Sequence, residues 1–180
     1  MDRVFDAFLQ RQLEDGSALA AQSDLLELLP FHGSPPDRYL VRYRCRGLVR
    51  SADGEIVEAE RFDLGVWFPH DYLRRANPFD VVTWFGPPNV FHPNLGSGPG
   101  GQIFICIGRL APGAPLVDIL EQCFEIITYQ KATLREDDAL DHAACAWARR
   151  NQHRLPIDPR PLRRRRVDFA VETTDEAKLT

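Results

Sequence analysis

The chain lacks a long uninterrupted run of apolar residues, and its start at Met1-Asp2-Arg3-Val4 is not the basic-then-apolar beginning of a leader peptide. A membrane-spanning helix needs about 20 consecutive apolar residues, and a secretory signal needs a basic segment followed by an apolar one. We therefore expect neither a membrane span nor a secretory signal. The cytoplasm is then the default location.

Cysteine is sparse, and no two cysteines have the Cys-x-x-Cys spacing that is typical of zinc knuckles. The sequence therefore predicts no structural metal site. In a reducing compartment the cysteines stay as free thiols. The four positions are Cys45, Cys106, Cys123 and Cys145.

An excess of positive charge is also missing, since the formal net charge of the 180 residues is −4. This balance gives no electrostatic reason to expect nucleic acid as the main partner. The exception is a basic segment at residues 160–166, which contains four consecutive arginines, Arg163 to Arg166. We interpret it as part of a solvated tail over 156–180, with binding to an acidic partner or nucleic acid as the alternative.

Helical periodicity occurs near both ends of the chain. Residues 2–13 and 19–29 each carry an apolar stripe, and Gly16 separates them, which predicts one interrupted helix or two short ones within a helical segment over 1–30. A last helix is predicted over 137–151, with Cys145 off its apolar face and accessible to solvent. Another helix is predicted behind Pro115, with an apolar stripe of Leu116, Ile119, Leu120, Cys123, Ile126 and Ile127.

The middle of the chain has the patterns of strands. Residues 38–48 alternate apolar and basic side chains, as in a half-buried strand. Asp53-Gly54 predicts a hairpin turn, and further strands follow over 55–61, 62–68 and 81–85. Helix, antiparallel meander and then helices make an α+β domain. We expect its catalytic part to span residues 31–155.

A tripeptide, His92-Pro93-Asn94, precedes the apolar segment that contains Cys106. A thiolate accepts acyl groups as thioesters that remain reactive toward amines. An asparagine N–H can stabilise the oxyanion of the tetrahedral intermediate. The intervening glycine-rich segment is not a phosphate loop, because no Gly-Lys-Ser/Thr follows it. This combination indicates acyl transfer through a thioester on Cys106, and the alternative is a buried core cysteine.

The tripeptide followed by a cysteine resembles the ubiquitin-conjugating enzymes. Residues 65–72 (Gly-Val-Trp-Phe-Pro-His-Asp-Tyr) are similar to the family's third strand and the turn after it. Pro87-Pro88 leads toward the tripeptide, 115–129 is similar to the helix after the active cysteine, and 135–140 is similar to the family's acidic loop. The resemblance covers roughly residues 36–152 and implies a UBC-like fold with an N-terminal helix, a four-stranded antiparallel meander and C-terminal helices.

The resemblance also implies roles for individual residues. Cys106 would carry a ubiquitin-like protein, Asn94 would stabilise the oxyanion and His92 would organise the backbone of the site. Asp138 lies where the family commonly has an acid that assists the attacking amine. The alternative for Asp137 and Asp138 is helix capping, because acidic residues suit the first turn of a helix.

The implied partners are a ubiquitin-like protein, an activating enzyme that consumes ATP, and a target protein. No metal or small cofactor is required at this step. The chain lacks the aromatic anchor that many family members offer to RING-type ligases, since Leu73-Arg74-Arg75 follows Tyr72. In this it looks like the bacterial conjugating enzymes encoded beside a ubiquitin-like protein, several of which act in antiphage defence.

Two other functions compete with conjugation. A binding module of the same fold would recognise a ubiquitin-like protein without carrying it, but such variants typically lack the cysteine. A cysteine hydrolase would use His92 as the general base for Cys106, and would need no activating enzyme.

Overall fold

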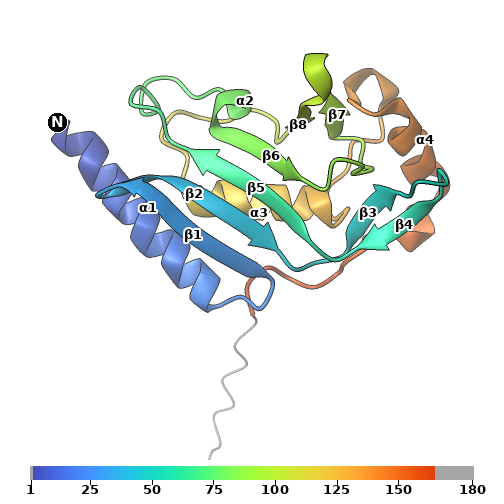
Figure 1. Ribbon diagram of the computed structural model, residues 1–180, viewed down its shortest axis with the longest axis horizontal. Coiled ribbons are helices and arrows are strands. Elements are labelled where there is room, and N and C mark those ends of the chain that lie inside the picture. The colour runs from blue at the N-terminus through green and yellow to red at the C-terminus, as the bar shows by residue number, and fades with distance from the viewer. Residues whose placement is uncertain (1, 165–180) are drawn as a thin grey trace, which may run out of the picture.

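The chain forms a helix, a central sheet with a hairpin inserted between two of its strands, a second hairpin and then further helices (Figure 1). The computed structural model describes residues 2–164. The longer elements are α1 (Arg3–Ala21), β1 (Leu26–Gly33), β2 (Pro36–Tyr43), β5 (Phe62–Trp67), β6 (Val82–Gly86), α3 (Leu116–Ile127) and α4 (His142–Arg150). The shorter ones are β3 (Gly47–Arg50), β4 (Ile56–Ala59), α2 (Pro78–Val81), β7 (Leu95–Ser97), β8 (Ile103–Ile105) and 3-10 turns at Pro99–Gly101, Glu136–Asp138 and Gln152–Arg154.

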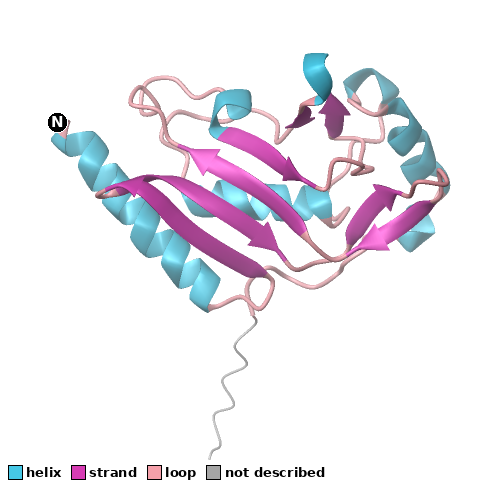
Figure 2. Ribbon diagram, in the orientation of Figure 1, coloured by secondary structure: helices cyan, strands magenta, loops and turns pink. Residues whose placement is uncertain are grey.

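The central sheet has four strands in the order β1-β2-β5-β6, and every neighbouring pair is antiparallel (Figure 2). Tyr39, Val41 and Tyr43 of β2 point into the core and are fully buried. Arg42 points to the opposite face, where it pairs with both Glu27 and Asp63. The predicted α+β class and the four-stranded antiparallel sheet are therefore confirmed. The strand predicted over 38–48 ends at Tyr43, and the strand predicted over 55–61 forms β4, which pairs with β3 in a separate two-stranded sheet.

The hairpin expected at Asp53-Gly54 is also present. Strands β3 and β4 pair across it, and Gly54 has a φ of 84°. That conformation favours glycine, because a side chain would be strained there.

The N-terminal helix differs from the prediction, because α1 runs without a break to Ala21 and the second helix over 19–29 does not form. Gly16 is buried inside α1, where a Cβ atom would come within 2.8 Å of Leu116 and 2.9 Å of Leu28. Its lack of a side chain lets α1 approach the core closely. Leu26–Gly33 instead forms β1, because pairing with β2 satisfies its backbone.

The helix behind Pro115 is confirmed, and the side chains of its predicted stripe are all buried. Its first turn is tied to α1, since the backbone N–H of Leu116 donates to Oε1 of Gln12 over 2.7 Å. Gln12 is only 2 % exposed. This contact satisfies a helix N-terminal donor that would otherwise be buried without a partner.

The last helix begins later than predicted, at His142 rather than at residue 137. Asp141 caps it, because its Oδ1 accepts from the backbone N–H of Ala144 over 2.9 Å. This start changes which side chains face the core. Cys145 is fully buried, so its predicted accessibility was wrong, and Leu140 lies outside the helix with 43 % of its surface exposed.

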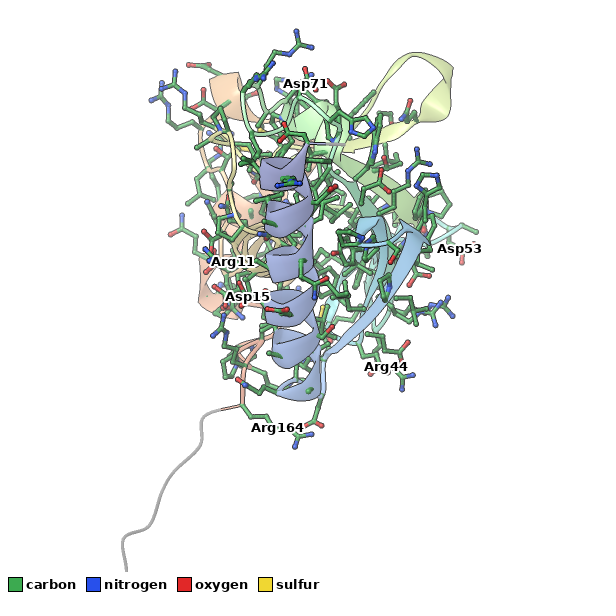
Figure 3. The ribbon with its side chains drawn as sticks, turned by 90° about the vertical axis from the view of Figure 1, so that its left-hand side faces the viewer. Arg11, Asp15, Arg44, Asp53, Asp71 and Arg164 are labelled. Carbon is green, nitrogen blue, oxygen red and sulfur yellow. The ribbon has the colours of Figure 1, made fainter. Side chains whose placement is uncertain are left out.

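The segment after α4 packs back onto the domain as far as the structure describes it. Leu162 joins the core, and the backbone N–H of Arg164 donates to the carbonyl of Gln22 just past the end of α1. Figure 3 shows Arg164 beside this end of α1. Residues 156–164 are thus not a solvated tail, whereas Arg165, Arg166 and the acidic end lie outside the described residues. Among the described helices, none combines the length and apolar character that a bilayer crossing requires.

Candidate functional site

The glycine-rich segment between the tripeptide and the cysteine forms a β-hairpin. Strands β7 and β8 pair in the register Leu95 with Ile105, and the turn contains Gly100 with a φ of 84°. The same register extends one residue further, because the backbone N–H of Cys106 donates to the carbonyl of Asn94 over 2.8 Å. Asn94 and Cys106 therefore lie directly opposite each other, although 12 positions separate them in the chain.

The carboxamide of Asn94 is held at both ends. Its Oδ1 accepts from the backbone N–H of Thr133 over 3.0 Å, and its Nδ2 donates to the carbonyl of Cys106 over 3.3 Å. An amide nitrogen has two hydrogens. One N–H of Asn94 is therefore left for a further acceptor beside the cysteine.

His92 supports the backbone of this site. Its Nδ1 accepts from the backbone N–H of Asn94 over 3.0 Å, and its ring packs against Tyr129 with 4.2 Å between ring centroids. Burial lowers the pKa of His92 to about 3, although the nearby Lys131 carbonyl favours a proton. Because Nδ1 is an acceptor, the proton of the neutral ring lies on Nε2, which is buried and has no hydrogen-bond partner of ordinary geometry among residues 2–164.

These contacts argue against His92 as a general base. Its Nδ1 lone pair is already used by the backbone, and its Nε2 is buried rather than open to a substrate. The geometry instead matches the backbone-organising role that the resemblance implies.

The segment that contains Asp138 is docked onto the tripeptide. The carbonyl of Pro93 accepts from the backbone N–H groups of Leu140 and Asp141, over 2.8 and 3.3 Å. The Asp138 side chain is 57 % exposed, and the contact of its carboxylate is an ion pair with Arg135 at 3.4 Å. Because Asp141 is the cap of α4, capping does not explain Asp138. The structure thus brings the acidic turn to the tripeptide but shows no direct contact from Asp138 to Cys106.

The four cysteines differ in exposure. Cys106 is partly exposed, whereas Cys45, Cys123 and Cys145 are completely buried. A thiol that accepts an acyl group from another protein must be reachable from outside. Among the four, Cys106 is the one that meets this condition.

Two contacts of the site could not be predicted from the sequence. The Thr133 contact uses a backbone N–H, which every residue but proline offers. The hydroxyl of Tyr129 donates to the carbonyl of Phe91 over 2.6 Å, from a residue with a φ of 60° just past the end of α3. A tyrosine at a helix end does not by itself indicate such a conformation.

A comparison with models of protein families finds no match to this chain, and a comparison with curated proteins finds none either. Within residues 2–164, no group of three or more His, Cys, Asp or Glu side chains is arranged to hold a metal ion. The assignment of a function thus depends on the geometry around Cys106.

Proposed function

We propose that this chain is a ubiquitin-like protein conjugating enzyme with a UBC-like fold. Cys106 accepts the C-terminal carbonyl of a ubiquitin-like modifier from an activating enzyme and passes it to a lysine amine of a target protein. The observation that supports this proposal is the hairpin register, which sets a carboxamide with a spare N–H opposite a partly exposed thiol.

The reaction has two acyl transfers. First, the Cys106 thiolate attacks the modifier's thioester carbonyl, a new C–S bond forms, and the thiolate of the activating enzyme leaves. Second, the amine attacks the Cys106 thioester, the C–N bond forms, the C–S bond breaks and Cys106 leaves as the thiolate. The amine loses its proton to the carboxylate of Asp138 or to water.

Asn94 contributes in the tetrahedral intermediate of both steps. Its remaining N–H can donate to the oxyanion, and the contacts with Thr133 and Cys106 hold the carboxamide in place before the substrate arrives. A donor fixed in advance stabilises the transition state because no reorganisation is needed at the moment of reaction.

A non-reducing gel tests the proposal. The chain is incubated with its cognate modifier, activating enzyme and Mg-ATP, and Cys106→Ala and Cys145→Ala are run in parallel. We expect an adduct that reducing agent removes, absent in Cys106→Ala and retained in Cys145→Ala. Active partners that give no adduct with the native chain would refute conjugation and favour the binding module.

Asn94→Asp tests the amide N–H groups of Asn94, both the spare one and the one that donates to the carbonyl of Cys106. Aspartate keeps an oxygen that can accept from Thr133 but has no N–H to donate. Loss of one oxyanion donor costs about a hundredfold or more in rate. Transfer to lysine at the rate of the native chain would show that Asn94 acts only as a brace.

A further inference from the structure

An apolar pocket lies on the hairpin beside the candidate nucleophile. Side chains alternate between the two faces of a strand, so Gly96 and Phe104 lie on the same face as Asn94 and Cys106. In the register of the hairpin, Gly96 pairs with Phe104. This pair is the next one on that face after Asn94 and Cys106.

The pocket has a volume of about 390 Å³. The rings of Phe79 and Phe104 meet edge to face, with 5.7 Å between centroids, and Leu140 contributes from the segment docked on Pro93. Phe79 and Leu140 are 47 % and 43 % exposed. The complete lining is Phe79, Gly96, Ser97, Phe104 and Leu140.

Gly96 forms part of this site through its missing side chain. A Cβ atom at this position would lie 2.8 Å from the Cβ of Leu140. The glycine therefore lets Leu140 close against the hairpin beside Phe104, where the two side chains share the wall of the pocket.

The distance along the strand fits an extended peptide. Two residues of a strand span roughly 7 Å, which is the step from Cys106 to Phe104 on one face. A peptide that lies extended along β8, with its terminal carbonyl at Cys106, has the side chain two residues earlier beside Phe104.

We propose that this pocket binds an apolar side chain two residues before the C-terminal residue of the modifier. The inference rests on the proposed function, because a modifier that is joined to Cys106 through its C-terminal carbonyl brings its tail to this face. An apolar side chain fits since all the large side chains that line the pocket are apolar. The pocket thus discriminates between modifiers by the sequence of their C-terminal tails.

Peptide thioesters test this selectivity without the activating enzyme. The probes are hexapeptides activated as aryl thioesters at a C-terminal glycine. Two residues before that glycine they carry either leucine or aspartate, and all other positions are serine. The Cys106 thiolate displaces the aryl thiolate, and intact-protein mass spectrometry measures the rate of adduct formation. We expect the leucine peptide to react roughly tenfold faster, because part of its side chain leaves water.

Variants from two different elements test whether the pocket causes the preference. Phe104→Ala and Leu140→Ala should both remove it while the aspartate peptide still reacts. Phe85→Ala is the matched control, because this aromatic residue is 58 % exposed on β6 but does not line the pocket. A thermal melt of each variant checks that the fold is retained.

The outcomes separate the two proposals. Equal rates for both peptides, with Cys106 acylated, would overturn the pocket inference and leave conjugation standing. A preference that survives in both pocket variants would do the same. Adducts that persist in Cys106→Ala, or no adduct with either peptide, would overturn the pocket inference together with the role of Cys106.

Discussion

Cys123 and Cys106 are the same residue type in two contrasting regions of the molecule. Cys123 lies on the apolar stripe of α3, where burial raises the pKa of its thiol to about 12. Cys106 lies at the end of the β7–β8 hairpin, partly exposed and opposite Asn94. The helix is packed on one side by the sheet and on another by α1, whereas the hairpin leaves one face open.

The contrast shows how the chain divides stability from reactivity. A thiolate is poorly stabilised in an apolar interior, so a core cysteine behaves as a small apolar side chain. At the hairpin, backbone hydrogen bonds hold the site, and the Cys106 thiol is not part of the hydrophobic core. Four experiments, ordered from the largest expected effect to the smallest, test the core and the hairpin site.

The first comparison is the reactivity of the four thiols toward iodoacetamide at pH 8. Cys106 should be alkylated at least about a thousandfold faster than the other three, because reaction requires an accessible thiolate. Burial raises the pKa of Cys45 to about 12, as it does for Cys123. Peptide mass spectrometry gives the rates, and labelling in denaturant should remove the difference. Rapid labelling of Cys123 in the native protein would contradict the contrast.

The second comparison sets two leucine truncations side by side. Leu120→Ala in α3 should lower the free energy of unfolding by about 2–5 kcal/mol, because its side chain is completely buried. Leu140→Ala beside the hairpin should change it by less than about 0.5 kcal/mol, since this side chain is 43 % exposed. Urea denaturation measures both, and similar losses would mean that Leu140 belongs to the core.

The third comparison is between acidic and neutral pH. The pKa of His92 is depressed to about 3 in the folded state, chiefly by burial, and lies near 6.5 when the chain unfolds. The contribution of His92 to the free energy of unfolding is therefore fully present above pH 6.5, and it declines as the pH falls from there toward 3. Between pH 7 and 5 the loss should be roughly 2 kcal/mol.

Urea denaturation of His92→Gln and His153→Gln at pH 7 and 5 tests this effect. The loss should shrink in His92→Gln and persist in His153→Gln, since His153 is exposed. An unchanged loss in His92→Gln would indicate that His92 is not held neutral by the fold.

The smallest expected effect concerns the contact between α1 and α3. Gln12→Met keeps the size of the side chain but removes the acceptor for the Leu116 N–H, leaving that donor buried without a partner. The cost should be about 1–2 kcal/mol. Gln10→Met is the control, because Gln10 is exposed and its side chain bonds to Glu14 on the same helix. Equal melting temperatures for the two variants would show that the cap contributes nothing.

Local periodicity determined much of this architecture. The apolar stripe of 116–127 and the alternation of 39–43 predicted α3 and β2, because burial of one face follows directly from spacing along a helix or a strand. Asp53-Gly54 likewise predicted its turn. The tripeptide and the cysteine identified the candidate site residues, though not their arrangement.

Tertiary contacts decided the rest. Gly16 predicted a helix break, but it lies inside α1, where Leu116 packs so closely that a side chain would not fit. The helix expected at residue 137 starts at His142, because Pro93 binds the backbone at Leu140 and Asp141 caps α4. The pairing of Asn94 with Cys106 depends on hydrogen bonds between residues 12 apart in the chain, which no local pattern encodes. Spacing within the sequence thus determined which side chains of α3 and β2 are buried, whereas only the folded chain decided where the last helix begins and which polar groups meet.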